Sequence, residues 1–273
     1  MLFNRVCEIV VGQSGGKGIS IKELRMSFAI DKNASETPNR SSVRIWNLSP
    51  TSRALIETPN NAIIVKAGYS EDVGAATIFV GVVTRSITLR EGADWVTELE
   101  LADGLIAYRD NKISVSYNAN SSVETVIKDL APRFGLPVRP YPDFEGKTYP
   151  QGFSFTGRTR EAMKKACDYA GLEWSMQNQE VQVIKKGGTL NSRALLISSE
   201  SGMIGSPEPE AKTMTEKNAA KQGLTVNDAG VIVSGTKETK KGELRRKLEV
   251  QGYKIRILLQ PNLSVGELVK VKS

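Results

Sequence analysis

The stretch Val43-Arg44-Ile45-Trp46-Asn47-Leu48-Ser49-Pro50 decides the fold of the first part of the chain. Apolar and polar residues alternate along its first half, which is the period of a half-buried β-strand. Ser49 can cap a helix and Pro50 suits the first helical position, so a short helix should follow and end near Pro59. The stretch therefore predicts a strand that leads directly into a short helix.

The residues on both sides of this stretch also have strand-like patterns. The first two runs should pair as a hairpin across the glycine-rich turn at 12–18, with the second run forming one long strand. Several long strands with one small helix predict a β-sandwich or barrel. The strands are expected at residues 6–11, 19–30, 43–47, 63–69, 76–87 and 95–101.

The middle of the chain predicts a small α+β domain. Ser121-Ser122-Val123-Glu124 matches a helix capping box, and apolar residues at helical spacing follow it. A second helix should have Thr159 as its cap and Gly171 just past its end. A hairpin across Asn178 should close this domain.

The end of the chain returns to strands. The strand that runs into Pro261 resembles the strand that runs into Pro50, which suggests two related β units. These strands are expected at residues 194–198, 224–226, 231–234, 253–259 and 267–271.

The composition excludes several classes of active site. The 273 residues contain no histidine, which excludes serine and cysteine triads, histidine zinc sites and facial-triad iron sites. Catalysis by carboxylate pairs, by lysine or by a metal held by oxygens stays open. Cys7 and Cys167 are far apart, so they indicate no disulfide scaffold, zinc site or redox pair. No stretch approaches the ~18 apolar residues of a membrane helix, and we expect a cytoplasm-like compartment or a particle assembled there.

Four motifs suggest chemistry, and each has a simpler interpretation that we favour. The glycine-rich turn at 12–18 has the wrong spacing for a phosphate-binding loop and precedes a strand. Ser234-Gly235-Thr236-Lys237 fits S-x-x-K, but its serine ends a predicted strand rather than starting a helix. Cys167 should be a buried apolar residue. A solvated strand face explains the acidic residues, which could otherwise be imagined as a carboxylate pair: Asp94, Glu98, Glu100 and Asp103.

The formal net charge of +7 permits contact with nucleic acid or an acidic surface. One basic run, at 237–247, has no interleaved aromatic residue for base stacking and contains two glutamates. A charged loop or a partner-docking arm is therefore favoured over a nucleic-acid site, which stays the alternative. The candidate contact residues are Lys237, Lys240, Lys241, Arg245, Arg246 and Lys247.

The order of these parts resembles the baseplate hub proteins of contractile-tailed phages, which are related to phage late-control tail proteins. The resemblance spans nearly the whole chain, although each motif is short. The motifs are Arg44-Ile45-Trp46-Asn47-Leu48-Ser49, Phe153-Ser154-Phe155-Thr156-Gly157-Arg158-Thr159-Arg160-Glu161-Ala162, Gly171-Leu172, Gly202-Met203-Ile204-Gly205-Ser206-Pro207 and Leu258-Leu259-Gln260-Pro261-Asn262-Leu263-Ser264-Val265-Gly266-Glu267.

The resemblance implies a mainly β chain in which two tail-tube-like β-sandwich or barrel domains flank a small α+β domain. The tube-like domains would be residues 1–117 and 187–273, and the α+β domain residues 118–186. Three chains would form a homotrimeric ring that adapts the sixfold tail tube to the threefold central spike and encloses the genome channel. An inserted loop or hairpin at about 213–249 departs from the family pattern, and its role is open.

The implied role is structural, without enzymatic activity, a cofactor or a metal. The implied partners are further copies of this chain, the tail tube protein, the central spike protein, other baseplate proteins and genomic DNA that passes without specific binding. The location would be the tail baseplate of a virion assembled in the host cytoplasm. Two competing hypotheses are a nucleic-acid-binding module acting through the 237–247 run and a cell-wall hydrolase.

Overall fold

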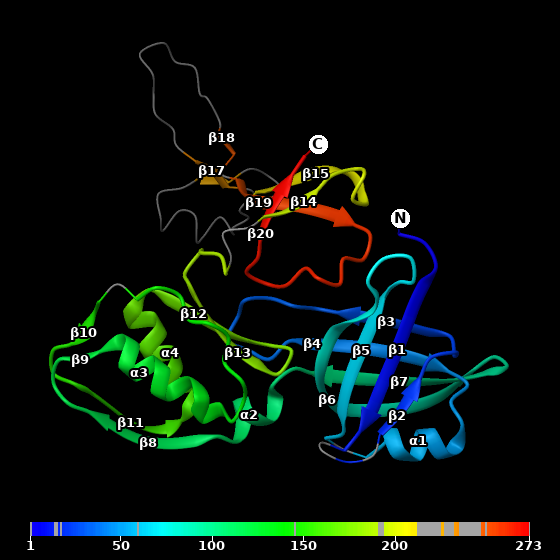
Figure 1. Ribbon diagram of the computed structural model, residues 1–273, viewed down its shortest axis with the longest axis horizontal. Coiled ribbons are helices and arrows are strands. Elements are labelled where there is room, and N and C mark those ends of the chain that lie inside the picture. The colour runs from blue at the N-terminus through cyan, green and yellow to red at the C-terminus, as the bar shows by residue number, and fades with distance from the viewer. Residues whose placement is uncertain are drawn as a thin grey trace, which may run out of the picture. The chain divides into compact units, whose positions relative to one another are not determined.

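The computed structural model describes residues 2–272 except 14, 15, 17, 59, 145, 191–193, 212–224, 227–231, 235–246 and 249. The protein is mainly β, as the sequence predicts (Figure 1). It divides into two compact units, and each is described by itself. The first unit is Met1–Leu195 with Leu259–Leu268, and the second is Leu196–Leu258 with Val269–Ser273.

The first unit begins with a seven-stranded antiparallel sheet. Its strands are β1 (Arg5–Gly12), β2 (Gly18–Ile21), β3 (Met26–Ile30), β4 (Arg40–Trp46), β5 (Ala62–Tyr69), β6 (Gly74–Glu91) and β7 (Asp94–Ala102). They lie in the order β2-β1-β5-β6-β7-β4-β3. The long strand β6 joins two halves of the sheet, because its first part pairs with β5 and its last part pairs with β7. A register irregularity between Val83 and Arg85 lies where β6 changes partner.

The sheet encloses an apolar core that also receives the first helix, α1 (Pro50–Ile56). Ile45 of β4 and Ile56 of α1 are both fully buried in it. The predicted start of the helix is confirmed, because Ser49 is the N-cap, its Oγ accepts a hydrogen bond of 3.1 Å from the Ser52 N–H, and Pro50 opens the helix. The stretch quoted first therefore folds as a strand followed directly by a helix.

The predicted long strand at 19–30 is wrong. Its two ends are separate strands, of which β2 pairs with β1 and β3 pairs with β4. These strands lie at opposite ends of the sheet order, so one continuous strand cannot form both. The chain leaves the sheet at 22–25, where Lys22 and Glu23 are exposed.

The rest of the first unit contains three two-stranded ribbons and four short helices. Figure 1 shows α3 and α4 side by side, and both pack on one apolar cluster that includes Val126 and Met163. The ribbons are β8–β11, β9–β10 and β12–β13. The elements are α2 (Leu105–Asp110), β8 (Lys112–Tyr117), β9 (Ser121–Ser122), α3 (Val123–Leu130), the 3-10 helix η1 (Ala131–Phe134), β10 (Thr148–Tyr149), β11 (Phe153–Arg158), α4 (Thr159–Ala170), β12 (Leu172–Gln177) and β13 (Glu180–Lys185).

Both predicted helices of this part are present, but their first residues differ from the prediction. Ser122, not Ser121, caps α3, and its Oγ accepts a hydrogen bond of 3.0 Å from the Thr125 N–H. Thr159 is the first residue of α4 rather than its cap, because β11 continues through Arg158 into the helix. The predicted Gly171 end is confirmed, with the φ of +73° that favours glycine.

The second unit is built from small sheets. β14 pairs with β20, β15 pairs with β19, and β17 lies between β16 and β18. A strand is present at each expected place in this region, whereas β15 and β18 were not predicted. The strand expected at 253–259 is found at 250–257, and residues 224 and 231 of two expected strands lie outside the described ranges. Pro207 and Pro209 lie within β15, which pairs with β19 and with no other described strand, and an edge strand of this kind tolerates proline. The strands are β14 (Ala194–Ile197), β15 (Met203–Ala211), β16 (Thr225–Val226), β17 (Ile232–Ser234), β18 (Lys247–Leu248), β19 (Val250–Ile257) and β20 (Leu268–Val271).

The division into domains at 117 and 186, and a second tube-like domain at 187–273, stay predictions. The insertion expected at 213–249 lies largely outside the described residues, apart from β16, β17 and β18.

The core position of Ile45 gives a stability test. Ile45→Ala should lower the free energy of unfolding by about 2–5 kcal/mol, because it leaves a cavity among fully buried side chains. Ile106→Ala, at an exposed position on α2, should change it by about 0.5 kcal/mol or less. Urea titration followed by circular dichroism measures both, and equal losses would contradict the described core.

Candidate assembly surface

The basic run predicted as a contact site lies almost wholly outside the described residues. Only Lys247 is placed, as the first residue of β18. The contact role of the run therefore stays a prediction. The residues outside the description are Lys237, Lys240, Lys241, Arg245 and Arg246.

The structure places Glu98 and Glu100 on an exposed face of β7. Glu98 forms an ion pair of 2.8 Å with Arg44, and Glu100 forms one of 3.0 Å with Arg85. Arg44 also pairs with Glu91 at the end of β6, which lies on the other side of β7 from β4. This is the cross-strand ladder of a solvated face, as interpreted from the sequence, and exposed pairs of this kind contribute little to stability.

The structure agrees with the simpler interpretation of the other three motifs, the glycine-rich turn, the S-x-x-K motif and Cys167. Gly12 pairs with Gly18 in the β1–β2 ladder, so the glycine-rich turn leads into a strand and not into the helix that a phosphate-binding loop needs. Ser234 is the last residue of a strand. Cys167 is buried on α4, where burial raises the pKa of its thiol to about 12 and keeps it protonated.

The far half of the β6–β7 hairpin has an open strand edge. β5 pairs with β6 only as far as Val82, and residues 85–91 pair with β7 alone. Among the residues that the structure describes, no strand lies on the other side of 85–91. Figure 1 shows this end of the hairpin reaching past the neighbouring strands. We call residues 85–91 the hairpin edge, and its free backbone groups can pair with another strand.

Two large apolar side chains are exposed beside the hairpin edge. Leu89 is 53% exposed and Trp95 is 45% exposed. They lie on opposite faces of the hairpin, because Leu89 pairs with Val96 and not with Trp95. Arg53 of α1 stacks over Trp95, 5.4 Å from the ring centroid. Tryptophan, arginine and exposed apolar groups are typical of protein–protein contacts.

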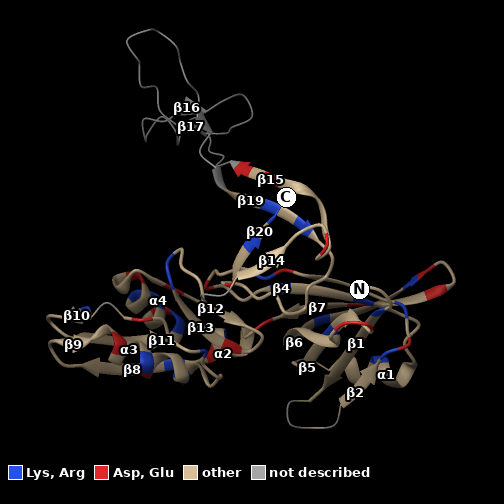
Figure 2. Cartoon of the chain, turned by 45° about the horizontal axis from the view of Figure 1, so that its top comes forward, with Lys and Arg blue, Asp and Glu red and all other residues tan. Residues whose placement is uncertain are grey.

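The face that carries Leu89 continues across the sheet to Trp46. Val96 lies between them, paired with Leu89 on one side and with Trp46 on the other. The guanidinium groups of Arg25 and Arg44 lie over the Trp46 ring, at 4.5 and 5.2 Å from its centroid. Figure 2 shows basic and acidic residues together on this hairpin. Val96 and Trp46 are themselves buried, so this face exposes Leu89 and the charged side chains beside it.

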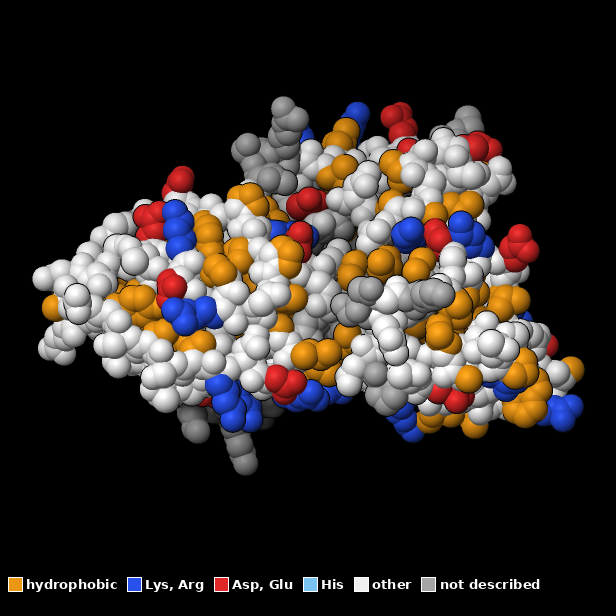
Figure 3. Space-filling model, turned by 60° about the horizontal axis from the view of Figure 1, so that its bottom comes forward, with side chains coloured by type: hydrophobic (Ala, Val, Ile, Leu, Met, Phe, Trp, Pro, Cys, Tyr) orange, Lys and Arg blue, Asp and Glu red, His pale blue; other side chains and the backbone are white. Residues whose placement is uncertain are grey.

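The ribbons of the second unit also expose large apolar side chains. Leu196 of β14, Ile204 of β15 and Tyr253 of β19 are all at least half exposed. Figure 3 shows exposed hydrophobic groups between charged ones on one face of the molecule. Apolar side chains exposed singly in this way are common on protein surfaces.

A buried aspartate joins the seven-stranded sheet to the α+β part. Asp103 follows β7 and is fully buried, so its interpretation as part of a solvated strand face is wrong. Its carboxylate accepts hydrogen bonds from the backbone N–H groups of Asn178 at 2.5 Å and Gln179 at 2.8 Å. Burial raises the pKa of Asp103, and the two hydrogen bonds and Lys32 oppose that rise. Asn178 and Gln179 both have positive φ, as a two-residue turn between β12 and β13 requires.

Further polar contacts surround this aspartate. Lys32 Nζ donates to Asn178 Oδ1 at 2.8 Å, and Gln177 Nε2 donates to the carbonyl oxygen of Asn33 at 2.7 Å. Asn39 Nδ2 donates to the carbonyl oxygen of Met176 at 3.2 Å. We call this set the turn clasp, and it holds the β12–β13 hairpin against the sheet. Its members are Lys32, Asn33, Asn39, Asp103 and residues 176–179.

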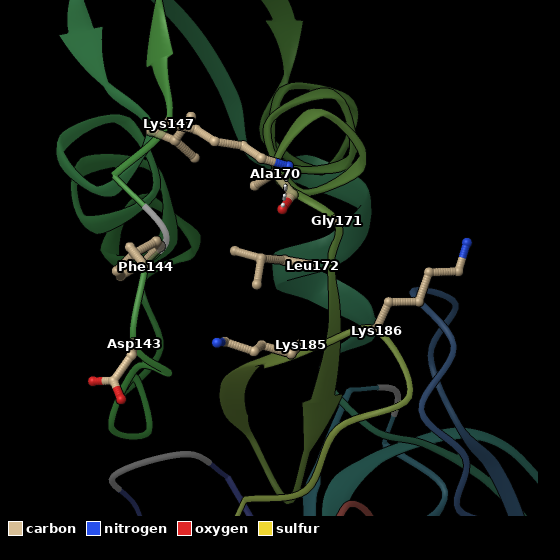
Figure 4. A pocket seen from close by; sticks show the side chains of 9 residues that line it. Asp143, Phe144, Lys147, Ala170, Gly171, Leu172, Lys185 and Lys186 are labelled. Carbon is tan, nitrogen blue, oxygen red and sulfur yellow. Dashed lines mark hydrogen bonds between the residues drawn. The ribbon is translucent and has the colours of Figure 1, made fainter.

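The α+β part also contains a half-open pocket of about 240 Å³ (Figure 4). The Lys185 side chain points into it, and Lys147 Nζ donates to the carbonyl oxygen of Ala170 at 3.3 Å. Phe144 and Leu172 supply apolar walls. Asp143 also lines the pocket, so its walls carry charges of both signs.

The described residues include no candidate metal site and no candidate membrane helix. Nowhere in the described ranges do three or more acidic or cysteine side chains form a group that could hold a metal ion. None of the helices described above has the length and apolar character needed to cross a membrane.

The fold has relatives among solved structures. The 43 kDa tail protein of prophage MuSo2 from Shewanella oneidensis is similar over 73% of this chain, with a TM-score of 0.51 and 11% identity. The tail protein from Neisseria meningitidis MC58 is similar over 76%, with a TM-score of 0.51 and 12% identity. This chain spans 59% and 60% of those two chains. No protein-family model and no curated protein matches the sequence.

At such low identity the comparison shows the fold alone, and that fold is one found in phage tail proteins. Sequence reasoning missed both the hairpin edge and the turn clasp. The sequence predicted part of β6, because a strand was expected at 76–87. No local pattern in the sequence marks the residue at which β6 stops pairing with β5.

The turn clasp gives a second stability test. Asp103→Ala should lower the free energy of unfolding by about 2–5 kcal/mol, because two backbone N–H groups lose their buried acceptor. Asp143→Ala, at an exposed position, should change it by about 0.5 kcal/mol or less. Denaturant titrations of the two variants check this, and a loss in Asp103→Ala no larger than the control would contradict the clasp.

Proposed function

We propose that this chain is a structural baseplate hub, in which three copies form a ring that adapts the sixfold tail tube to the threefold central spike and encloses the genome channel. The fold shared with phage tail proteins supports a tail role. The order of parts in the sequence supports the hub within that class. The single structural observation that supports association between copies is the unpaired hairpin edge.

The mechanism is geometric. Each chain would contribute two tube-like domains, at 1–117 and 187–273. A ring of three chains then presents six similar domains, which match a sixfold tube. The α+β domain at 118–186 lies between them in sequence, and the turn clasp fixes it to the first sheet. A rigid connection of this kind keeps all three copies in the same geometry, as a closed ring requires.

The hairpin edge supplies the contact between copies. Residues 85–91 offer unpaired backbone donors and acceptors that a strand of a second copy can satisfy. Side chains of the added strand on the same face also cover Leu89, which is otherwise exposed. Burying this large apolar side chain beside a line of backbone hydrogen bonds favours association and fixes its register.

The proposed partners beyond the ring are the tail tube protein, the central spike protein and other baseplate proteins. Genomic DNA passes through the channel without specific binding. The role needs no enzymatic step and no cofactor, and the place of action is the tail baseplate of a virion.

The ring gives a test in solution. Sedimentation velocity or native mass spectrometry should find three times the 29.8 kDa of one chain. Leu89→Asp should shift this mass to that of one chain, because it places a charge in the contact. Val73→Asp changes an exposed apolar residue in the turn just before β6 and should leave the assembly unchanged.

Circular dichroism should show the same strand content in both variants, which separates lost assembly from lost folding. A monomeric wild type, a ring of six identical copies or a fully assembled Leu89→Asp variant would each contradict the proposal.

A further inference from the structure

Three side chains of the turn clasp supply the groups that are needed to form an amide bond between two side chains. Lys32 Nζ lies 2.8 Å from Asn178 Oδ1, and the two residues are 146 positions apart in the sequence. Fully buried Asp103 binds the backbone N–H of the same Asn178. An amine, a carboxamide and a buried carboxyl group are the groups that an intramolecular transfer of an acyl group needs.

We propose that Lys32 and Asn178 join through an isopeptide bond, with Asp103 carrying the proton between them. Lys32 Nζ forms a bond to Asn178 Cγ, and the bond from Cγ to Nδ2 breaks. One amine proton passes through Asp103 to Nδ2, which leaves as ammonia. The other amine proton stays on the new amide nitrogen, so the step balances without an oxidant, a reductant or a co-reactant.

The surroundings of Lys32 favour the neutral amine that attacks. Burial lowers the pKa of Lys32, Asp103 raises it, and the positive charge of Arg139 lowers it. A lysine whose ammonium form is disfavoured by burial is a better nucleophile at neutral pH than an exposed lysine. The hydrogen bond to Oδ1 holds the amine close to the carbonyl carbon that it attacks.

The position of Asp103 suits proton transfer. Its negative charge acts on Lys32 and raises the pKa of that amine, so the carboxyl group lies near the nitrogen that must lose a proton. Burial raises its pKa, which lets the carboxyl group take up a proton and release it again. Its hydrogen bonds to Asn178 and Gln179 hold the turn in place while the side-chain amide reacts.

The bond would connect parts of the chain that are otherwise held by hydrogen bonds. Lys32 lies in the loop between β3 and β4, and Asn178 lies in the turn between β12 and β13. A covalent link here would prevent the β12–β13 hairpin from leaving the sheet under load. This inference does not depend on the proposed assembly, because the reaction occurs within one chain.

The mass of the purified full-length chain tests the bond. Loss of ammonia should lower the intact mass by about 17 Da relative to the sequence. Lys32→Arg and Asp103→Asn should each restore the mass expected for that variant. Lys164→Arg removes a lysine that pairs with Glu36 on the surface and should keep the loss.

Peptide mapping assigns the position of the loss. A single branched peptide should contain both Lys32 and Asn178, and Lys32→Arg should yield two separate peptides while the protein stays folded. A wild type with the full sequence mass would overturn the proposal. A loss of the same size on a linear peptide, as succinimide formation at an asparagine produces, would also overturn it, and so would a loss that persists in Asp103→Asn.

Discussion

The carboxylate of Asp103, buried at the end of β7, is the interaction on which the arrangement of the first unit depends. It accepts hydrogen bonds from two backbone N–H groups of the β12–β13 turn, those of Asn178 and Gln179. Because an unpaired buried carboxylate is costly, the sheet and the hairpin are stable together and less stable apart. Gly104 follows with a φ of +62° and lies so close to Met176 that a side chain at this position would collide with it.

The strand β6 has the complementary role at the other end of the sheet. Eighteen residues long, it leaves β5 after Val82 and continues with β7 alone. The sheet therefore has an unpaired edge that is long enough to accept a strand, although natural sheets usually protect such edges. A protein that assembles through its sheet would keep this edge open and place apolar groups beside it, as Leu89 and Trp95 are placed.

Local patterns in the sequence predicted most helices and strands, but they did not predict which strands pair. Ser49 with Pro50 marks the start of α1, and Gly171 marks the end of α4, because caps depend on nearby backbone groups. The break at 22–25 arises because β2 and β3 pair with different strands. No local pattern in the sequence shows these pairings. Asp103 appeared in the sequence as one of several acidic residues near a strand end. Its role depends on a turn 75 positions later in the chain.

The most direct test of the central claim is a reconstruction of the assembled ring from electron micrographs. The account predicts threefold symmetry, two similar β domains from each chain around the channel, and a strand of a neighbouring copy paired with residues 85–91. A ring of six identical copies, or a threefold ring in which residues 85–91 face solvent, would contradict it.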